Sequence, residues 1–393
     1  MPNLARILSS LAWLFAASAA FSVPHLPTSD AEVLERLPAR AEDPRRREMS
    51  ELRHALAAHP GDVALALRLA RRYYAEVAAE GDPRYIGYAQ AALAPWWGLA
   101  DPPVEARVMR AILLQFNHQF EPALADLKIA VEAEPDNGEA WAWLAAIAMV
   151  RADYTLARAA CERFAPQTTP AIAAGCRAHV DAATGHAQAA ATALRAALKT
   201  DTEADAGERL WALTRLAEIE ERLGHGPAAE AAYREALALN ITDGYLLAAY
   251  ADFLLDHGRA AEVLTLLQGK ERSDLLLLRL ALAAKALGNP ALAGWQRDLG
   301  ARFDAAKLRG DTVHQKEESR YALHLLGDAP RALTLAQQNY AVQREPADAR
   351  ILLEAALAAK QPAAAEPVLK WMQASGIDSV ALKNLARQLG SGS

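Results

Sequence analysis

The stretch "WAWLAAIAMVRADYTLARAAC", Trp141–Cys161, decides the fold. Two alanine-rich segments flank a short turn centred on Ala152. Ala145 lies seven residues before that turn, and Ala157 lies five residues after it. Two helices joined by a tight turn can cross closely only where small side chains meet at the crossing. The stretch therefore predicts an antiparallel helix hairpin.

The same spacing recurs along the chain, which indicates a repeat. Five glycines punctuate it at intervals of 39, 34, 30 and 39 residues: Gly185, Gly224, Gly258, Gly288 and Gly327. Upstream, His118 and Ala152 take the glycine's place. The residues seven before and five after each turn are Ala111 and Ala123, Ala145 and Ala157, Ala178 and Ala190, Ala217 and Ala229, Ala251 and Val263, Ala281 and Ala293, and Arg320 and Ala332. Six of these seven frames carry alanine before the turn, and only Arg320 departs. Glycine suits the turn because it adopts the positive φ that ends a helix.

The pattern resembles that of the tetratricopeptide repeat (TPR) family. Trp141, Leu144, Ala145, Ala148 and later Ala157 with Cys161 look like W-x2-L-G-x2-Y…A-x3-F, with alanine in place of glycine and tyrosine. Pro135 stands where the pattern expects a closing proline. The resemblance covers about residues 60–376. It implies an all-α, right-handed superhelical solenoid of antiparallel helix hairpins, and a role in binding proteins.

The organisation expected along the chain has four parts. Residues 1–20 are a signal peptide, and 29–59 hold two N-terminal helices, the first of them capped by Ser29 or Asp30. Residues 60–376 form an array of about nine hairpins. Residues 377–390 form a C-terminal helix that caps the stack, as terminal repeats must.

The N-terminal segment predicts export. "MPNLARILSSLAWLFAASAAFSVP" places Arg6 before an uncharged run, with small residues at Ala19 and Ala20. A short basic region, an apolar stretch and an A-x-A-like end are typical of a secretory signal peptide. The expected location is exported and periplasmic. The alternative is an uncleaved anchor in the inner membrane with the repeats in the periplasm, and contact with a membrane is expected only in that case.

Composition and motifs exclude several function classes. The formal net charge is −6 and no long basic stretch exists, so a nucleic-acid partner is not expected. No phosphate loop, dinucleotide fingerprint, H-E-x-x-H, C-x-x-C or G-x-S-x-G is present. His314 and His324 lie ten residues apart, on different faces of a helix. We therefore assign no catalytic residue, no metal ligand and no cofactor.

A binding surface is expected on the concave face, which the first helix of each hairpin lines. Its candidate partner-binding residues are apolar in the first part of the array and acidic further on: Ile112, Phe116, Met149, Glu218, Glu221, Asp252 and Asp256. Such a groove would hold an extended or helical peptide with apolar anchors and some basic residues. The alternative is that these positions are ordinary solvated or packed ones.

Cys161 and Cys176 are the two cysteines of the chain. Thr169 as N-cap and Pro170 as first helical residue would start the helix that carries Cys176. The two cysteines then lie at similar heights on neighbouring antiparallel helices, and an exported compartment preserves disulfides. A bridge and two separate buried thiols both stay open, because height alone does not fix which way each side chain faces.

The leading interpretation is a non-enzymatic scaffold or adaptor of the bacterial cell envelope that binds a protein or peptide on its concave face. The alternative is a periplasmic chaperone that binds peptides or client proteins during assembly. An enzyme built on a helical superhelix is a remote third, because no stretch outside the repeats is long enough for a catalytic domain. The sequence does not specify the partner or the oligomeric state.

Overall fold

The computed structural model describes residues 44–311 and 313–391. The chain divides into two compact units, Met1–Glu48 and Met49–Ser393. The predicted signal peptide and the helix expected from Ser29 lie outside the described residues. Within the described ranges every regular element is helical, which confirms the all-α class. No helix in these ranges is long and apolar enough to cross a membrane.

In the part of the chain that the structure describes, the helices pair into nine hairpins in chain order. The pairs are α3 (Val63–Glu80) with α4 (Arg84–Ala92), α6 (Val104–Phe116) with α7 (Phe120–Ala133), α8 (Gly138–Val150) with α9 (Tyr154–Phe164), α10 (Pro170–Ala183) with α11 (Ala187–Thr200), α12 (Ala206–Arg222) with α13 (Gly226–Ala238), α14 (Gly244–Asp256) with α15 (Ala260–Leu266), α16 (Asp274–Leu287) with α17 (Leu292–Leu308), α18 (Gln315–Arg320) with α19 (Ala329–Val342), and α20 (Pro346–Ala358) with α21 (Glu366–Ser375).

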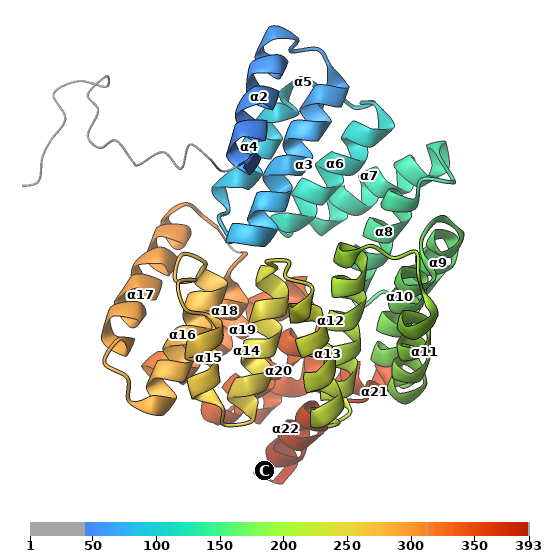
Figure 1. The fold of residues 1–393 in the computed structure, drawn as a ribbon. Coiled ribbons are helices and arrows are strands. Elements are labelled where there is room, and N and C mark those ends of the chain that lie inside the picture. Colours follow the sequence, from blue (N-terminus) through green and yellow to red (C-terminus); the bar gives the residue numbers. More distant parts are fainter. Residues whose placement is uncertain (1–43, 312, 392–393) are drawn as a thin grey trace, which may run out of the picture. The chain divides into compact units, whose positions relative to one another are not determined.

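Shorter elements connect or flank these pairs. They are α2 (Pro44–Ala58) before the array, α5 (Ala94–Trp97), η1 (Ala165–Gln167), η2 (Tyr321–Leu326), η3 (Pro362–Ala365) and α22 (Val380–Ser391) at the end. The π-helical η2 continues α18. Each hairpin packs on its neighbours, so successive hairpins form a superhelical stack with an apolar interior (Figure 1).

The small residues predicted at the helix crossings are buried. At most 3% of the surface is exposed at Ala111, Ala123, Ala145, Ala157, Ala178, Ala190, Ala217, Ala229, Ala251, Val263, Ala281 and Ala332. Ala293 is the exception and is exposed, since it lies at the second position of α17, whose buried residues begin only at Leu299. The crossing rule therefore holds wherever the second helix packs from its first turn.

The turns adopt the conformation that their glycines indicated. The φ angles are +83° at Gly185, +80° at Gly224 and +72° at Gly258. His118 and Ala152, which replace glycine in the first frames, also have positive φ, of 55° and 59°. The backbone of the repeat is thus kept even where a side chain makes that conformation costly.

Several helices begin at a residue whose side chain accepts a hydrogen bond from the first turn, which satisfies a free N–H group. These N-caps are Asp62, Asn137, Asp153, Asp205, Asp243 and Asp328. Thr169 is the N-cap of α10 and Pro170 its first residue, but the Thr169 hydroxyl makes no capping bond. Instead the Ala171 N–H donates to Asp201 Oδ2 at 2.6 Å. Asp201 lies 30 positions downstream of Ala171 and so replaces the missing cap.

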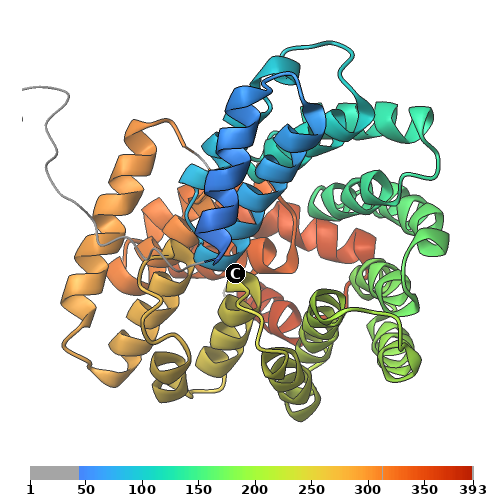
Figure 2. The same cartoon turned by 45° about the horizontal axis from the view of Figure 1, so that its top comes forward.

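The last hairpins return to the earlier part of the array. In Figure 2 the helices from α8 to α17 follow an arc, and the C-terminal helices lie inside it. The Arg344 N–H donates to the Val150 carbonyl at 2.8 Å, and Arg151 Nη1 donates to the Val342 carbonyl at 2.6 Å. A Cβ on Gly185 would lie 3.0 Å from the Gly376 carbonyl oxygen. The chain thus places its own C-terminal helices on the inner side of the superhelix.

Candidate functional site

The structure joins Cys161 of α9 to Cys176 of α10 by a disulfide. Their Cα atoms are 5.7 Å apart, and the bridge closes a loop with a sequence separation of 15 residues. Cys161 is buried in the first hydrophobic cluster, and Cys176 packs against that cluster from outside. The bridge therefore links two neighbouring hairpins, and neither cysteine is available as a nucleophile in this form.

The apolar candidates on the concave face are largely used inside the stack. Ile112 and Met149 are buried in the first hydrophobic cluster, and Phe116 is partly buried against it. Phe116 also lines a cavity of about 230 Å³ together with His118 and His314. The predicted apolar anchors for a partner are thus mostly core residues in this structure.

Glu218 and Glu221, both on α12, accept hydrogen bonds or ion pairs from residues of α12, α13 and α14. Glu218 forms a salt bridge with Arg215, with Nη1 3.0 Å from Oε2, and accepts a hydrogen bond from the Tyr245 hydroxyl at 2.5 Å. The Tyr233 hydroxyl donates to Glu221 Oε2 at 2.9 Å. Burial raises the pKa of Glu221 to about 7 in spite of that hydrogen bond. Both carboxyl groups therefore already have donors within the array.

Asp252 and Asp256, both on α14, are paired with arginines from far downstream. Arg320 donates to both oxygens of Asp252, at 2.8 and 2.9 Å, and Arg279 donates to Oδ2 at 2.6 Å. Arg350 likewise contacts Asp256, with Nη2 2.8 Å from Oδ1. Burial would raise the pKa of Asp252, but the charges of the two arginines outweigh it and lower that pKa. The basic residues predicted for a partner are supplied by the chain's own α16, α18 and α20.

The arginine bound to Asp256 belongs to a longer polar chain. Arg350 Nε donates to Glu354 Oε1 at 2.7 Å, and His324 Nε2 lies 3.0 Å from Glu354 Oε2. Burial raises the pKa of Glu354, but the His324 hydrogen bond and the Arg350 charge dominate and lower it to about 2. The carboxylates of Asp252, Asp256 and Glu354 are therefore all paired within the chain. Binding of an external partner to the predicted concave residues stays a prediction.

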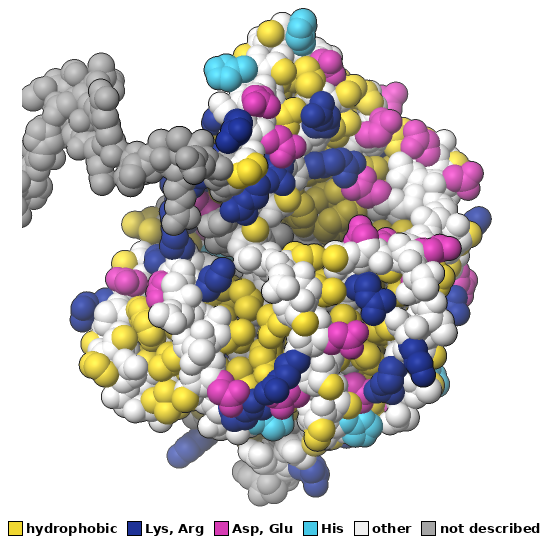
Figure 3. Space-filling model, viewed as in Figure 1, with side chains coloured by type: hydrophobic (Ala, Val, Ile, Leu, Met, Phe, Trp, Pro, Cys, Tyr) yellow, Lys and Arg dark blue, Asp and Glu magenta, His cyan; other side chains and the backbone are white. Residues whose placement is uncertain are grey.

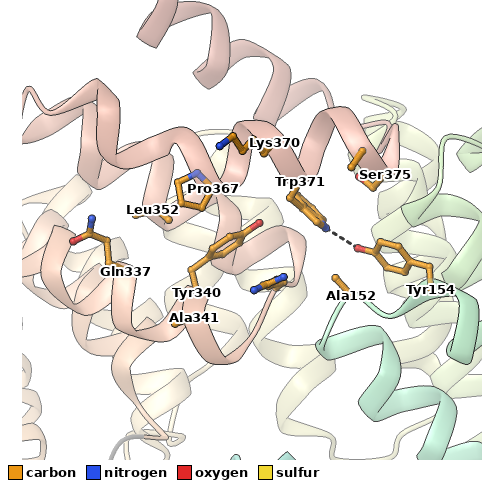
Figure 4. Close-up of a pocket in the computed structure, with 12 residues that line it drawn as sticks. Ala152, Tyr154, Gln337, Tyr340, Ala341, Leu352, Pro367, Lys370, Trp371 and Ser375 are labelled. Atoms are coloured by element: carbon orange, nitrogen blue, oxygen red, sulfur yellow. Dashed lines mark hydrogen bonds between the residues drawn. The ribbon is translucent and has the colours of Figure 1, made fainter.

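A second candidate surface lies where the C-terminal helices meet the α8–α9 turn. A cavity of about 690 Å³ is lined there by Ala152, Tyr154, Gln337, Tyr340, Ala341, Arg344, Leu352, Pro367, Lys370, Trp371, Ala374 and Ser375. We call it the aromatic pocket (Figure 4). Trp371 Nε1 donates to the Tyr154 hydroxyl at 2.9 Å, and the rings of Tyr340 and Trp371 meet edge to face, with centroids 6.4 Å apart.

The polar groups of the aromatic pocket are mostly hydrogen-bond donors. The Tyr340 hydroxyl is buried and has no hydrogen-bond partner among the described residues. Burial raises the pKa of Tyr340, so the hydroxyl keeps its proton. Lys370 is exposed on the rim and pairs with Glu366 at 2.7 Å. None of the lining residues is acidic.

Sequence reasoning missed this pocket, although its first tyrosine lies inside the stretch that revealed the repeat. Tyr154 and Trp371 are 217 residues apart. The available signal was the presence of large and basic residues near the ends of α19 and α21, namely Tyr340, Arg344, Lys370 and Trp371. That signal does not say which residues meet in space.

No strongly charged patch marks another site on the face shown in Figure 3. Basic and acidic side chains are mixed there, and apolar side chains fill a hollow between them. Across the described ranges, no group of three or more His, Cys, Asp or Glu side chains could hold a metal ion.

The fold is a tetratricopeptide-like helical repeat. Similar solved structures include the APC/C hetero-tetramer Cut9–Hcn1, at 13% identity and a TM-score of 0.47 over 88% of this chain and 73% of that one. A human IFIT1 dimer with PPP-AAAA is similar at 13% identity and a TM-score of 0.46, over 89% and 94% of the two chains. The P58(IPK) TPR domain has 16% identity and a TM-score of 0.20, over 82% and 95%.

These likenesses concern the arrangement of helices, and no activity or partner is carried over from them. No protein-family model matches the sequence, and no curated protein sequence matches it.

Proposed function

We propose that this protein is a non-enzymatic interaction scaffold or adaptor whose protein partner docks in the aromatic pocket. The observation that carries the proposal is the meeting of Tyr154, Tyr340 and Trp371 around one open cavity, beside Arg344. Trp, Tyr and Arg are the side chains that dominate the energy of protein interfaces, because they bury large areas and retain a polar handle.

The proposed place of action is the cell envelope of a bacterium, on its periplasmic side. Two observations support it. The N-terminal segment has the composition of a signal peptide. The disulfide between Cys161 and Cys176 suits an oxidising compartment. Retention of the N-terminal segment as an inner-membrane anchor is the alternative.

The concave face is the alternative docking site. A partner there would compete with Arg320 and Arg350 for Asp252 and Asp256. Because these pairs already satisfy the carboxylates, an incoming basic residue gains little unless α18 and α20 move. At the aromatic pocket no ion pair has to be displaced, since it is an open cavity and no lining residue is acidic.

A pull-down from envelope extract tests the proposal. The bait is the full mature chain, and two variants alter the pocket: Trp371→Ala and Arg344→Glu. Arg344 is exposed, so its replacement leaves the stack intact even where the loss of Trp371 weakens it. Leu308→Ala on α17 is the matched control, because Leu308 is 89% exposed and does not line the pocket.

We expect wild type and the Leu308 variant to retain one stable partner that both pocket variants lose. A further bait changes Glu218, Glu221, Asp252 and Asp256 to Lys, and loss of the partner with this bait alone would place docking on the concave face. Weak capture of many unfolded chains would favour the assembly chaperone. Capture of nothing above background would refute the scaffold itself.

A further inference from the structure

We propose that the aromatic pocket recognises a protein segment in which a carboxylate side chain neighbours a large apolar residue. This inference rests on the proposed function, since it names the chemistry of the partner at the same site. The unpaired donors of the pocket and the rings that line it support this inference.

Arg344 is the first of these features. Its backbone N–H is bonded to the Val150 carbonyl at 2.8 Å, which fixes the residue at the junction of the two chain segments. Within the described ranges its guanidinium makes no hydrogen bond or ion pair, whereas Arg320 and Arg350 are fully engaged. An arginine held by its backbone, with a free planar donor group, is suited to bind a carboxylate through two parallel hydrogen bonds.

The hydroxyl groups of Tyr340 and Tyr154 are the second element. The Tyr340 side chain is almost wholly buried, with 4% of its surface exposed, and its hydroxyl lacks an acceptor. A buried polar group without a partner is unfavourable, so a carboxylate that reaches this hydroxyl after a small shift of the lining side chains gains a hydrogen bond that the free protein lacks. The Tyr154 hydroxyl accepts from Trp371 and so keeps its own proton to donate.

Charge complementarity is the third element. The lining residues include two cations and no carboxylate. Lys370 is paired with Glu366, so Arg344 carries the unpaired positive charge. Burial raises the pKa of Tyr340, and the charge of Arg344 is the largest effect that opposes it. Burial also raises the pKa of Tyr154, where Arg344 lowers it by less than Glu345 raises it. Donors and positive charge thus converge on one place. An acceptor with negative charge is what satisfies them.

The rings supply the apolar half of the site. Trp371 and Tyr340 meet edge to face, and Leu352 and Pro367 complete an uncharged wall in Figure 4. Such a wall takes a phenylalanine, tyrosine or leucine side chain, whose burial releases water from both surfaces. Arg344 and the aromatic rings line the same cavity. We therefore place the apolar side chain and the carboxylate on adjacent residues of the partner.

Fluorescence polarisation with labelled decapeptides tests this inference on the full mature protein. All peptides are acetylated and amidated, so that neither terminus carries charge, and have a Gly/Ser context. Their cores are Phe-Glu, Phe-Gln and Ala-Glu. We expect the Phe-Glu peptide to bind at least tenfold more tightly than either of the others.

Variants then assign each half of the recognition. Arg344→Gln should abolish the preference for Glu over Gln while the preference for Phe over Ala remains. Tyr340→Phe keeps the ring but removes the hydroxyl, and should weaken the two Glu-containing peptides by a few-fold while leaving the Phe-Gln peptide unchanged. Leu308→Ala should bind all three peptides as wild type does.

Equal binding of Phe-Glu and Phe-Gln, an Arg344 variant that keeps the Glu preference, or no binding of any peptide at 1 mM would overturn the inference. The proposed scaffold function would still hold after such a result if the pull-down retains a partner that the pocket variants lose. A pull-down without any partner, beside a positive peptide result, would refute the scaffold and keep the recognition chemistry.

Discussion

Replacing Asp252 by alanine removes the shared acceptor of two arginines, and this should cost far more stability than the same change at Asp256 on the same helix. The Arg279 side chain is 5% exposed and that of Arg320 is 20% exposed. Removing one partner of a buried ion pair leaves a charge without compensation and costs about 3–5 kcal/mol. Because the Asp252 side chain is itself 26% exposed, we expect the lower end, about 3 kcal/mol.

Asp256 is the matched control. It also forms a two-pronged pair with an arginine, but its side chain is 35% exposed and that of Arg350 is 37% exposed. Exposed pairs contribute about 0.2–1 kcal/mol, so Asp256→Ala should cost about 0.5 kcal/mol. Arg320→Ala should fall between the two, since Asp252 then still has Arg279 at 2.6 Å.

Urea unfolding followed by circular dichroism at pH 7 measures these free energies, and double-mutant cycles isolate each pair. The pKa of Asp252 is lowered in the folded state, so its contribution is complete above about pH 4, the pKa of an unfolded aspartate, and is lost as the pH falls through the folded-state pKa. Equal losses at Asp252 and Asp256, or a cost at Asp252 below about 1 kcal/mol, would refute the reasoning from burial.

Three further predictions follow from the same structure. Replacing both Cys161 and Cys176 by serine should lower the free energy of unfolding by about 3 kcal/mol, the chain-entropy value for a loop of 15 residues, and dithiothreitol should then have no further effect on the urea midpoint. Glu354→Gln should reduce the loss of unfolding free energy between about pH 4.5 and pH 2. A carboxyl with a lowered pKa stabilises the fold above that pH range and no longer does so below it. An unchanged pH dependence in this range would contradict the pairing of Glu354 with His324 and Arg350. Gly185→Ala should destabilise more than Gly258→Ala in the same unfolding assay, since both have positive φ but only the first would bring a Cβ within 3.0 Å of a carbonyl oxygen; equal losses would show that the close approach is absent.

The repeat could be predicted from the sequence because its determinants are local. Ala145 and Ala157 are buried at the crossing of one hairpin, and the turn between them takes positive φ at Ala152 even without glycine. Spacing within about 15 residues specifies such a unit, since each hairpin is held mostly by its own two helices and their neighbours. The exception at Ala293 arose where the second helix begins before it packs.

The return of the C-terminal helices could not be predicted in this way. Arg320 stood out as the one residue that broke the alanine pattern, but nothing local showed that it would reach Asp252, 68 residues earlier. The aromatic pocket has the same origin, because its tyrosine and tryptophan come from repeats that are distant in the chain. A single sequence reveals the unit of a solenoid more readily than the way the units close on one another.

The contacts between Arg151 and Val342 and between Arg344 and Val150 have a consequence for the order of folding. An open solenoid has low contact order and can assemble hairpin by hairpin as the chain emerges. This chain cannot finish in that manner, because pairs 68 to 217 residues apart form only after the last helices are present. Until then Asp252 and Asp256 lack their distant arginines, and a chain truncated before α18 should be a looser, more acidic-faced intermediate that proteases cut faster than the complete protein.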